Sequence, residues 1–273
     1  MDKLGIIGTP SDWLISCNVD KEKAKSVFNI ELEEIKIDEL KELYEKFKGH
    51  PYPDGKFKDT FNPEEILKAY DLYLALKEIV EKHDLKGFTI RCFDLITMLH
   101  TTSCLALSLL NEEGIIASCE GDVPAMITMY VVRKLINQSS FQANPSMIDV
   151  DKNEMILAHC TLPLNMCTSY KFKTHFESHS AIGIKGEMEL GPINVIRINS
   201  NLDTFVILKG EIIENLDLEN LCRTQIRVKF IKGSSVLYFL KNPLGNHHIV
   251  VYGENEDVFK KYFLSIGLKE VTY

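Results

Sequence analysis

Four groups with metal-ligating chemistry fall at predicted strand ends or turns of the chain rather than inside its elements. They are Glu120, Asn144, His159 and the adjacent pair His247 and His248. A carboxylate, one or two imidazoles and a nearby amide oxygen suit a divalent metal ion that keeps open positions for a substrate. Because neighbouring side chains of a strand point to opposite faces, we expect at most one of the adjacent histidines to join a given site.

Glu120 is the strongest candidate because of the elements around it. The apolar residues 115–118 predict a buried strand, and the apolar segment from 123 onward predicts a helix. Pro124 suits the first helical turn, and the carboxylate of Asp122 can cap the helix. Glu120 is then left at the carboxyl end of a strand, where open α/β sheets bind their ligands. The alternative interpretation of this glutamate is a solvated loop residue or a cap, and that of the histidines is a hydrogen bond to the backbone.

Two further residues are predicted to bind a substrate. Arg91 ends the predicted strand 87–91, where it suits an anionic or hydroxyl-rich ligand or, alternatively, an ion pair with a carboxylate. Trp13 lies in the loop after the first strand, and its alternative role is that of a packed turn residue. His175 and His179 fit the wall of a cleft as well as a polar loop.

The composition disfavours several functions. The 31 Lys and Arg residues against 39 Asp and Glu residues give a net charge of −8, which disfavours nucleic acid because phosphate binding requires a basic face. No apolar run reaches the roughly 18 to 20 residues that span a bilayer, so no membrane partner is expected. The 7 cysteines have no paired spacing and the N-terminus does not resemble a signal peptide. Both observations predict a cytoplasmic protein with reduced thiols. A phosphate loop, a nucleophile elbow and a zinc-type cysteine pattern are absent.

Strands and helices alternate in the first half of the chain. Apolar strands are predicted at 4–8, 31–37, 87–91 and 115–118, and helices at 21–27, 39–48, 62–83, 95–111 and 123–136. This alternation is typical of a doubly wound parallel sheet. Short β-branched segments follow at 140–143, 155–159, 193–198, 204–213, 225–230, 235–239 and 248–252, with a last helix at 256–265. They predict an antiparallel barrel or sandwich. We therefore predict an α/β fold with a Rossmann-like domain at 1–165 and a β-rich domain at 166–273.

Several segments resemble the L-fucose and L-arabinose isomerase family. Residues 119–129 are similar to the Glu-x-Asp-x-x-x-Ala-Leu-Thr-Met segment of L-fucose isomerases and to the Glu-Gly-Asp turn of L-arabinose isomerases. Residues 141–144 resemble the Phe-Ala-Asp segment of the former, and residues 157–160 the strand of the latter that carries a metal-binding histidine. Residues 245–253 resemble the Ala-Asn-His-Gly strand that carries the third L-fucose isomerase ligand. Because the opening segment resembles the start of the family's second domain, we expect the N-terminal domain to be missing.

The resemblance implies an oligomeric aldose–ketose isomerase that acts on a sugar. In that family a manganese-type ion bridges the sugar's O1 and O2, and carboxylates move a proton between C1 and C2. Carried over by position, Glu120 is a metal ligand and base, and His247 is the histidine ligand. Asn144 stands at the position of the second carboxylate, which is both catalytic and a ligand. His159 is a ligand by the L-arabinose isomerase comparison.

Asn144 departs from the family pattern because an amide takes up no proton and brings no negative charge to a metal. Asp149 would replace it if the loop between them folds back, and His248 is a further metal or substrate candidate. The leading hypothesis is a metal-dependent sugar isomerase. The alternatives are a non-catalytic sugar-binding or regulatory protein on the same fold, and another metal-assisted reaction such as an aldol cleavage or an epimerisation.

Overall fold

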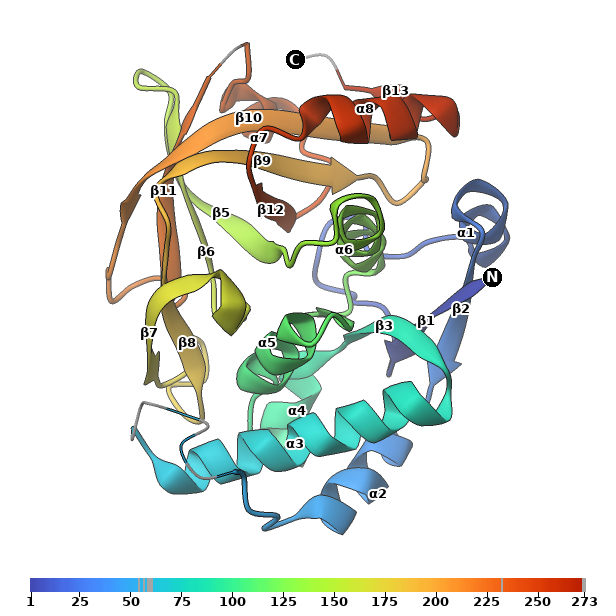
Figure 1. Cartoon of the computed structure of the whole chain (residues 1–273), viewed down its shortest axis with the longest axis vertical. Coiled ribbons are helices and arrows are strands. Elements are labelled where there is room, and N and C mark those ends of the chain that lie inside the picture. Colours follow the sequence, from blue (N-terminus) through green and yellow to red (C-terminus); the bar gives the residue numbers. More distant parts are fainter. Residues whose placement is uncertain (54, 56, 58–60, 232, 272–273) are drawn as a thin grey trace.

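The apolar segments of the first half form a parallel sheet in the computed structural model, which describes residues 1–53, 55, 57, 61–231 and 233–271 (Figure 1). Its strand order is β2 (Ile30–Ile35), β1 (Asp2–Ile7), β3 (Leu85–Ile90) and β4 (Ile116–Ser118). All three pairings are parallel, so the carboxyl ends of the strands meet at one edge. The loops that follow β1, β3 and β4 therefore come together there.

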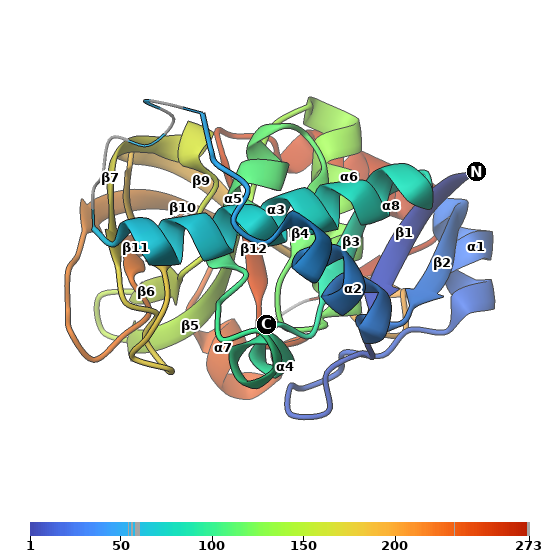
Figure 2. The ribbon, with the colours of Figure 1, turned by 90° about the horizontal axis from the view of Figure 1, so that it is seen from below.

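Helices cover both faces of the parallel sheet. One face carries α1 (Lys21–Phe28) and α6 (Val123–Ile136), and the other carries α2 (Ile37–Phe47), α3 (Pro63–Lys82) and α5 (Cys104–Glu112). Figure 2 shows α2 and α3 on the outer side of the molecule. None of the helices in the described part of the chain combines the length with the apolar character that spanning a bilayer requires.

The second half forms an antiparallel barrel of six strands, which decides between the predicted barrel and sandwich. The strands follow one another as β11 (Thr224–Phe230), β6 (Glu154–His159), β5 (Phe141–Asp149), β12 (His248–Tyr252), β9 (Gly191–Ile198) and β10 (Thr204–Asn215). The long strand β10 pairs with β9 along its first part and with β11 along its second, and this closes the ring. A short strand, β13 (Lys269–Glu270), adds to β10 in parallel.

Three smaller elements surround the barrel. A hairpin of β7 (Cys167–Lys173) and β8 (Gly183–Met188) follows a short 3₁₀ turn at Leu164–Met166, and α8 (Glu256–Ser265) packs against β10. The hairpin contributes Phe172 and Ile184 to the apolar core under α3 and α5. All seven cysteines carry free thiols.

The structure differs from the sequence prediction at two elements. Residues 235–239 were expected as a strand, but Leu237–Lys241 is a helix, α7. Its consecutive aromatic side chains Tyr238 and Phe239 are both buried, which the alternation of a strand with one buried face does not allow. The single helix expected at 95–111 is divided into α4 (Cys92–Met98) and α5. His100 adopts a left-handed φ of 54° between them, which ends the first helix.

Helix α6 joins the two halves of the fold. It packs against β3 and β4 on one side and against β9 and β12 on the other, and Figure 1 shows it end-on between the parallel sheet and the barrel. Strands β5 and β6 precede residue 165 yet belong to the barrel sheet, so the pairing changes from parallel to antiparallel after β4. The division into domains at 1–165 and 166–273 and the doubly wound description stay predictions.

Candidate metal and active site

The turn that carries Glu120 has an unusual backbone. Glu120 and Gly121 adopt left-handed φ angles of 61° and 64° between β4 and α6. A side chain at position 121 would lie 2.8 Å from the backbone nitrogen of Ser11, so the close approach of the loop after β1 requires glycine. A left-handed non-glycine residue is costly and is often found at functional sites. Here it directs Glu120 toward the barrel.

Glu120, His159 and His247 meet between the parallel sheet and the barrel. Glu120 Oε1 lies 3.2 Å from His159 Nε2 and 3.3 Å from His247 Nε2. The three ligand atoms lie within 4.8 Å of one another, and all three residues are buried. Glu120 follows β4, His159 ends β6, and His247 immediately precedes β12. The parallel sheet thus supplies the carboxylate, and the barrel supplies both imidazoles.

The chemistry of this group fits a metal ion. His247 Nε2 is buried and has no hydrogen-bond partner among the described residues, because its contact with Glu120 lies outside hydrogen-bonding geometry. Glu120 Oε1 lies 3.2 and 3.3 Å from the two imidazole nitrogens. Such distances are typical of ligand atoms that bind one ion at about 2.0–2.2 Å. One carboxylate and two imidazoles leave further coordination positions for a substrate. The site could therefore hold a divalent metal.

A second layer of contacts orients the two histidines. His247 Nδ1 lies 2.9 Å from Asp122 Oδ2, and the same oxygen accepts a hydrogen bond of 2.9 Å from Arg197 Nη1. The other oxygen of Asp122 caps α6 by accepting from Ala125 N–H at 3.0 Å. His159 Nδ1 lies 2.9 Å from Thr161 Oγ1. Metal-ligating histidines usually have such a partner on their second ring nitrogen, which fixes the ring orientation.

The charged groups of the site shift the pKa values of Glu120, Asp122 and His247. Burial raises the pKa of Glu120, but the neighbouring His247 and His159 outweigh it and hold this pKa well below its usual range. Burial likewise raises the pKa of Asp122, but Arg197 and His247 lower it to about 2. Burial lowers the pKa of His247, but Glu120 and Asp122 raise it to about 9. At neutral pH the metal-free site therefore holds ionised carboxylates and a protonated His247.

Metal binding at pH 7 is expected to release about one proton, because a histidine must be neutral to ligate a metal. Since the pKa of His247 is raised to about 9, affinity for Mn²⁺ should increase as the pH rises from 6 toward 9 and then level off. Calorimetric titrations with MnCl₂ in buffers of different ionisation enthalpy measure the released proton. An affinity that does not change over this range, with no proton release, would contradict the protonated state of His247.

Two residues near this group were not predicted from the sequence. Gln142 of β5 is buried, and its amide oxygen accepts from Ser118 Oγ and Cys119 N–H, at 3.0 and 2.8 Å. Its amide nitrogen donates to the Cys119 carbonyl at 3.1 Å, so Gln142 holds the residue before Glu120. Arg197 was also missed. A glutamine and an arginine within apolar strands give no local signal of such a role.

The remaining barrel candidates occupy different places. Asn144 is half-buried and lies on the same face of β5 as Gln142, two residues further along. His248 is not brought to Glu120: it lies 3.0 Å from the hydroxyl of Tyr238, and burial, with Arg197 nearby, lowers its pKa to about 3. Asp149 is also not brought there, because it ends β5 and pairs with Lys152 on the surface. The loop after residue 144 does not fold back toward Glu120.

Of the two predicted substrate-binding residues, Trp13 contacts Glu120 and Arg91 contacts Trp13. Trp13 Nε1 donates a long hydrogen bond of 3.5 Å to Glu120 Oε2, and Trp13 remains 41% exposed. The guanidinium of Arg91 lies 4.7 Å from the centre of the Trp13 ring, and Phe93 packs against that ring edge-on. His175 lies beyond Phe93, with ring centres 6.2 Å apart. Loops after β1 and β3 thus form an aromatic and cationic border beside Glu120.

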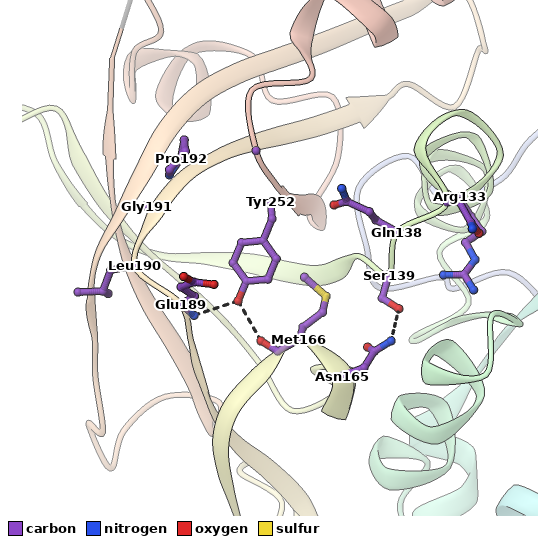
Figure 3. Close-up of a pocket in the computed structure, with 12 residues that line it drawn as sticks. Arg133, Gln138, Ser139, Asn165, Met166, Glu189, Leu190, Gly191, Pro192 and Tyr252 are labelled. Carbon is purple, nitrogen blue, oxygen red and sulfur yellow. Dashed lines mark hydrogen bonds between the residues drawn. The ribbon is translucent and has the colours of Figure 1, made fainter.

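A separate cavity lies at the other end of α6. It has a volume of about 560 Å³ and is lined by Arg133, Gln138, Asn165, Glu189 and Tyr252 among others (Figure 3). Asp122 caps the start of the helix, whereas Arg133 is in its last turn. A helix rises about 1.5 Å per residue, so this cavity is remote from Glu120.

Sequence comparisons connect this geometry to known proteins. No family model matches the chain. It is similar to sulfoquinovose isomerases from Priestia aryabhattai and Priestia megaterium, each 22% identical over 92% of this chain and 60% of the relative. A sulfoquinovose isomerase from a Clostridium species is 25% identical over 44% of the chain and 26% of its own length. The chain thus spans about 60% of the length of the Priestia relatives. These similarities support placing the chain with a sugar isomerase family.

Proposed function

We propose that this chain carries the catalytic site of a metal-dependent aldose–ketose isomerase of the L-fucose and L-arabinose isomerase type. The observation that supports this proposal most is the meeting of Glu120, His159 and His247 at the carboxyl edge of the parallel sheet. The relatives' names make sulfoquinovose the first sugar to test. As the resemblance implies, we also propose a cytoplasmic homo-oligomer.

The two oxygens of Glu120 have different surroundings and, in this proposal, different tasks. Oε1 lies beside both imidazoles and would bind the metal, whereas Oε2 lies toward Trp13 and the open border. A carboxylate oxygen in that position can take a proton from one sugar carbon and return it to the next. His159 and His247 would hold the metal, and Asp122 would keep the His247 ring in place.

A divalent ion, which we propose to be Mn²⁺, would polarise the sugar carbonyl and stabilise the negative charge that develops on the sugar oxygens. The donor set suits Mn²⁺ and other first-row ions, and the preference for Mn²⁺ rests on the family resemblance. Asn144 cannot share the proton transfer. Its place on the Gln142 face of β5 suits a hydrogen bond to a sugar hydroxyl, and we assign it that task.

The test combines metal binding with product detection. The purified protein is expected to bind one Mn²⁺ and to convert sulfoquinovose, L-fucose or L-arabinose to a ketose in D₂O, followed by proton NMR. Proton transfer through Glu120 exchanges with solvent and places deuterium next to the carbonyl. Chelator-treated protein is the control. If Mn²⁺ binds stoichiometrically but none of these sugars gives a ketose, the isomerase proposal fails and a sugar-binding protein on this fold remains. Absence of metal binding would also overturn it.

A further inference from the structure

Arg91 places a cation one side chain away from Glu120. It follows β3 directly and precedes α4, at the carboxyl edge of the parallel sheet. Its guanidinium lies 4.7 Å from the Trp13 ring centre, and the same ring donates to Glu120 Oε2. The three side chains therefore form a row from the metal-binding group to the surface. The chain has a net charge of −8, so a cation placed beside the candidate site is a candidate for binding an anionic group.

The guanidinium of Arg91 contacts three polar side chains that are themselves exposed to solvent. Arg91 Nε lies 3.0 Å from Asp94 Oδ2, Nη1 donates to Thr9 Oγ1 at 3.2 Å, and Nη2 lies 3.3 Å from Asp12 Oδ1. The Asp12 side chain is 73% exposed. An ion pair with so exposed a partner contributes little to stability. The Asp12 carboxylate thus marks a position at which an oxyanion can bind Arg91. A ligand can displace this carboxylate with little loss of free energy.

We propose that Arg91 binds the acidic group of a sugar substrate, a sulfonate in the first instance, in place of the Asp12 carboxylate. This inference rests on the proposed isomerase function. A six-carbon sugar has its reacting carbons at one end, which would lie at Glu120, and the acidic group at the other. Trp13 contacts both Glu120 and Arg91 and is partly exposed, so its ring offers an apolar surface to the carbon chain between them. A planar guanidinium binds an oxyanion through two parallel N–H groups.

The substrate named for the relatives agrees with this arrangement. Sulfoquinovose carries a sulfonate, as its name states, and quinovose is the same sugar without it. Comparing the affinities of sulfoquinovose and quinovose therefore isolates the contribution of the sulfonate to binding. Phosphorylated sugars share the oxyanion chemistry, so a sugar phosphate serves as a second acidic probe.

Trp13 is the chain's single tryptophan, so its fluorescence reports directly on this position. Titrations with sulfoquinovose and quinovose are made with and without Mn²⁺ on the wild type, Arg91→Gln, Asp12→Asn and Arg133→Gln. Wild type is expected to bind sulfoquinovose at least tenfold more tightly than quinovose. Arg91→Gln should lose this difference, and Asp12→Asn should increase it severalfold, because the competing carboxylate is gone. Arg133→Gln, at the remote cavity of Figure 3, should match the wild type.

Steady-state kinetics separates this inference from the proposed function. Arg91→Gln is expected to raise KM for sulfoquinovose more than it lowers kcat. If the variant isomerises and binds sulfoquinovose as the wild type does, the role of Arg91 is wrong while the isomerase proposal stands. If sulfonate-selective binding depends on Arg91 but no sugar yields a ketose, the isomerase proposal fails and Arg91 remains an anion-binding residue. A wild type that does not distinguish the two sugars overturns the inference.

Discussion

Replacing Glu120 with glutamine is expected to abolish stoichiometric Mn²⁺ binding and to lower the isomerisation rate by about 10³- to 10⁴-fold. The substitution keeps the size and one oxygen of the side chain, so the contact with Trp13 can persist. It removes the negative charge that faces His159 and His247 at 3.2 and 3.3 Å. It also removes the carboxylate of the candidate metal site, and with it the group that we propose takes the proton.

Glu31→Gln is the matched control, because Glu31 is an exposed residue of β2 in the same parallel sheet. It changes the net charge equally and should leave metal binding and turnover unchanged. Denaturant unfolding checks that both variants are folded, because Glu120→Gln loses the ionised carboxylate that His247 and His159 favour in the folded protein. A Glu120→Gln protein that keeps one tightly bound Mn²⁺ and measurable ketose formation would remove Glu120 from both assigned roles.

Local signals were sufficient to predict one half of the candidate site. The apolar run at 115–118 predicted a strand, and the capping Asp122 with Pro124 predicted the start of a helix. Glu120 was therefore placed at the end of the strand, where the structure has it. His159 ends β6 as the segment 155–159 predicted. These features depend on neighbours within a few residues, so a single sequence carries them.

The choice between His247 and His248 depends on strand pairing that the sequence does not reveal. In β12, Ile249 is opposite Gln142 of β5 and Ile196 of β9. This register turns His247 and Ile249 toward α6 and Glu120, and His248 toward the barrel interior, where it meets Tyr238. A shift of one residue would exchange the two histidines. The alternation rule predicted one ligand from this pair, and the register decides which.

Partners from distant strands account for what the sequence interpretation missed. Arg197 reaches Asp122 across 75 residues, and Gln142 reaches Cys119 across 23. Neither residue type stands out in an apolar strand until the opposing surface is known. The helix α7 was missed for a similar reason, because its buried aromatic residues meet His248 and the barrel core.

Replacing Arg197 with methionine is expected to lower the free energy of unfolding by up to about 3–5 kcal/mol, because it removes one of the two charged partners of the buried Asp122 carboxylate and leaves His247 as the other. Arg197 and Asp122 are both fully buried, and Nη1 of Arg197 donates to Asp122 Oδ2 at 2.9 Å. Methionine fills much of the same volume, so the loss reports on charge rather than on a cavity. Urea unfolding followed by circular dichroism measures it. Arg227→Met, which breaks the exposed pair with Glu214, is the control and should cost about 1 kcal/mol or less.

The pH dependence of this difference separates a charge effect from lost packing. In the wild type the pKa of Asp122 is lowered to about 2, so the stability that ionised Asp122 contributes is present above pH 4 and is lost as the pH falls toward 2. Without Arg197, His247 is left to oppose the effect of burial, so the pKa of Asp122 should be higher than in the wild type and ionised Asp122 should contribute less stability to the variant. The gap between wild type and Arg197→Met should therefore narrow between pH 5 and pH 2, whereas a packing defect would keep it constant. A constant gap would show that Arg197 acts on Asp122 by filling space, and it would remove the electrostatic support that we assign to His247.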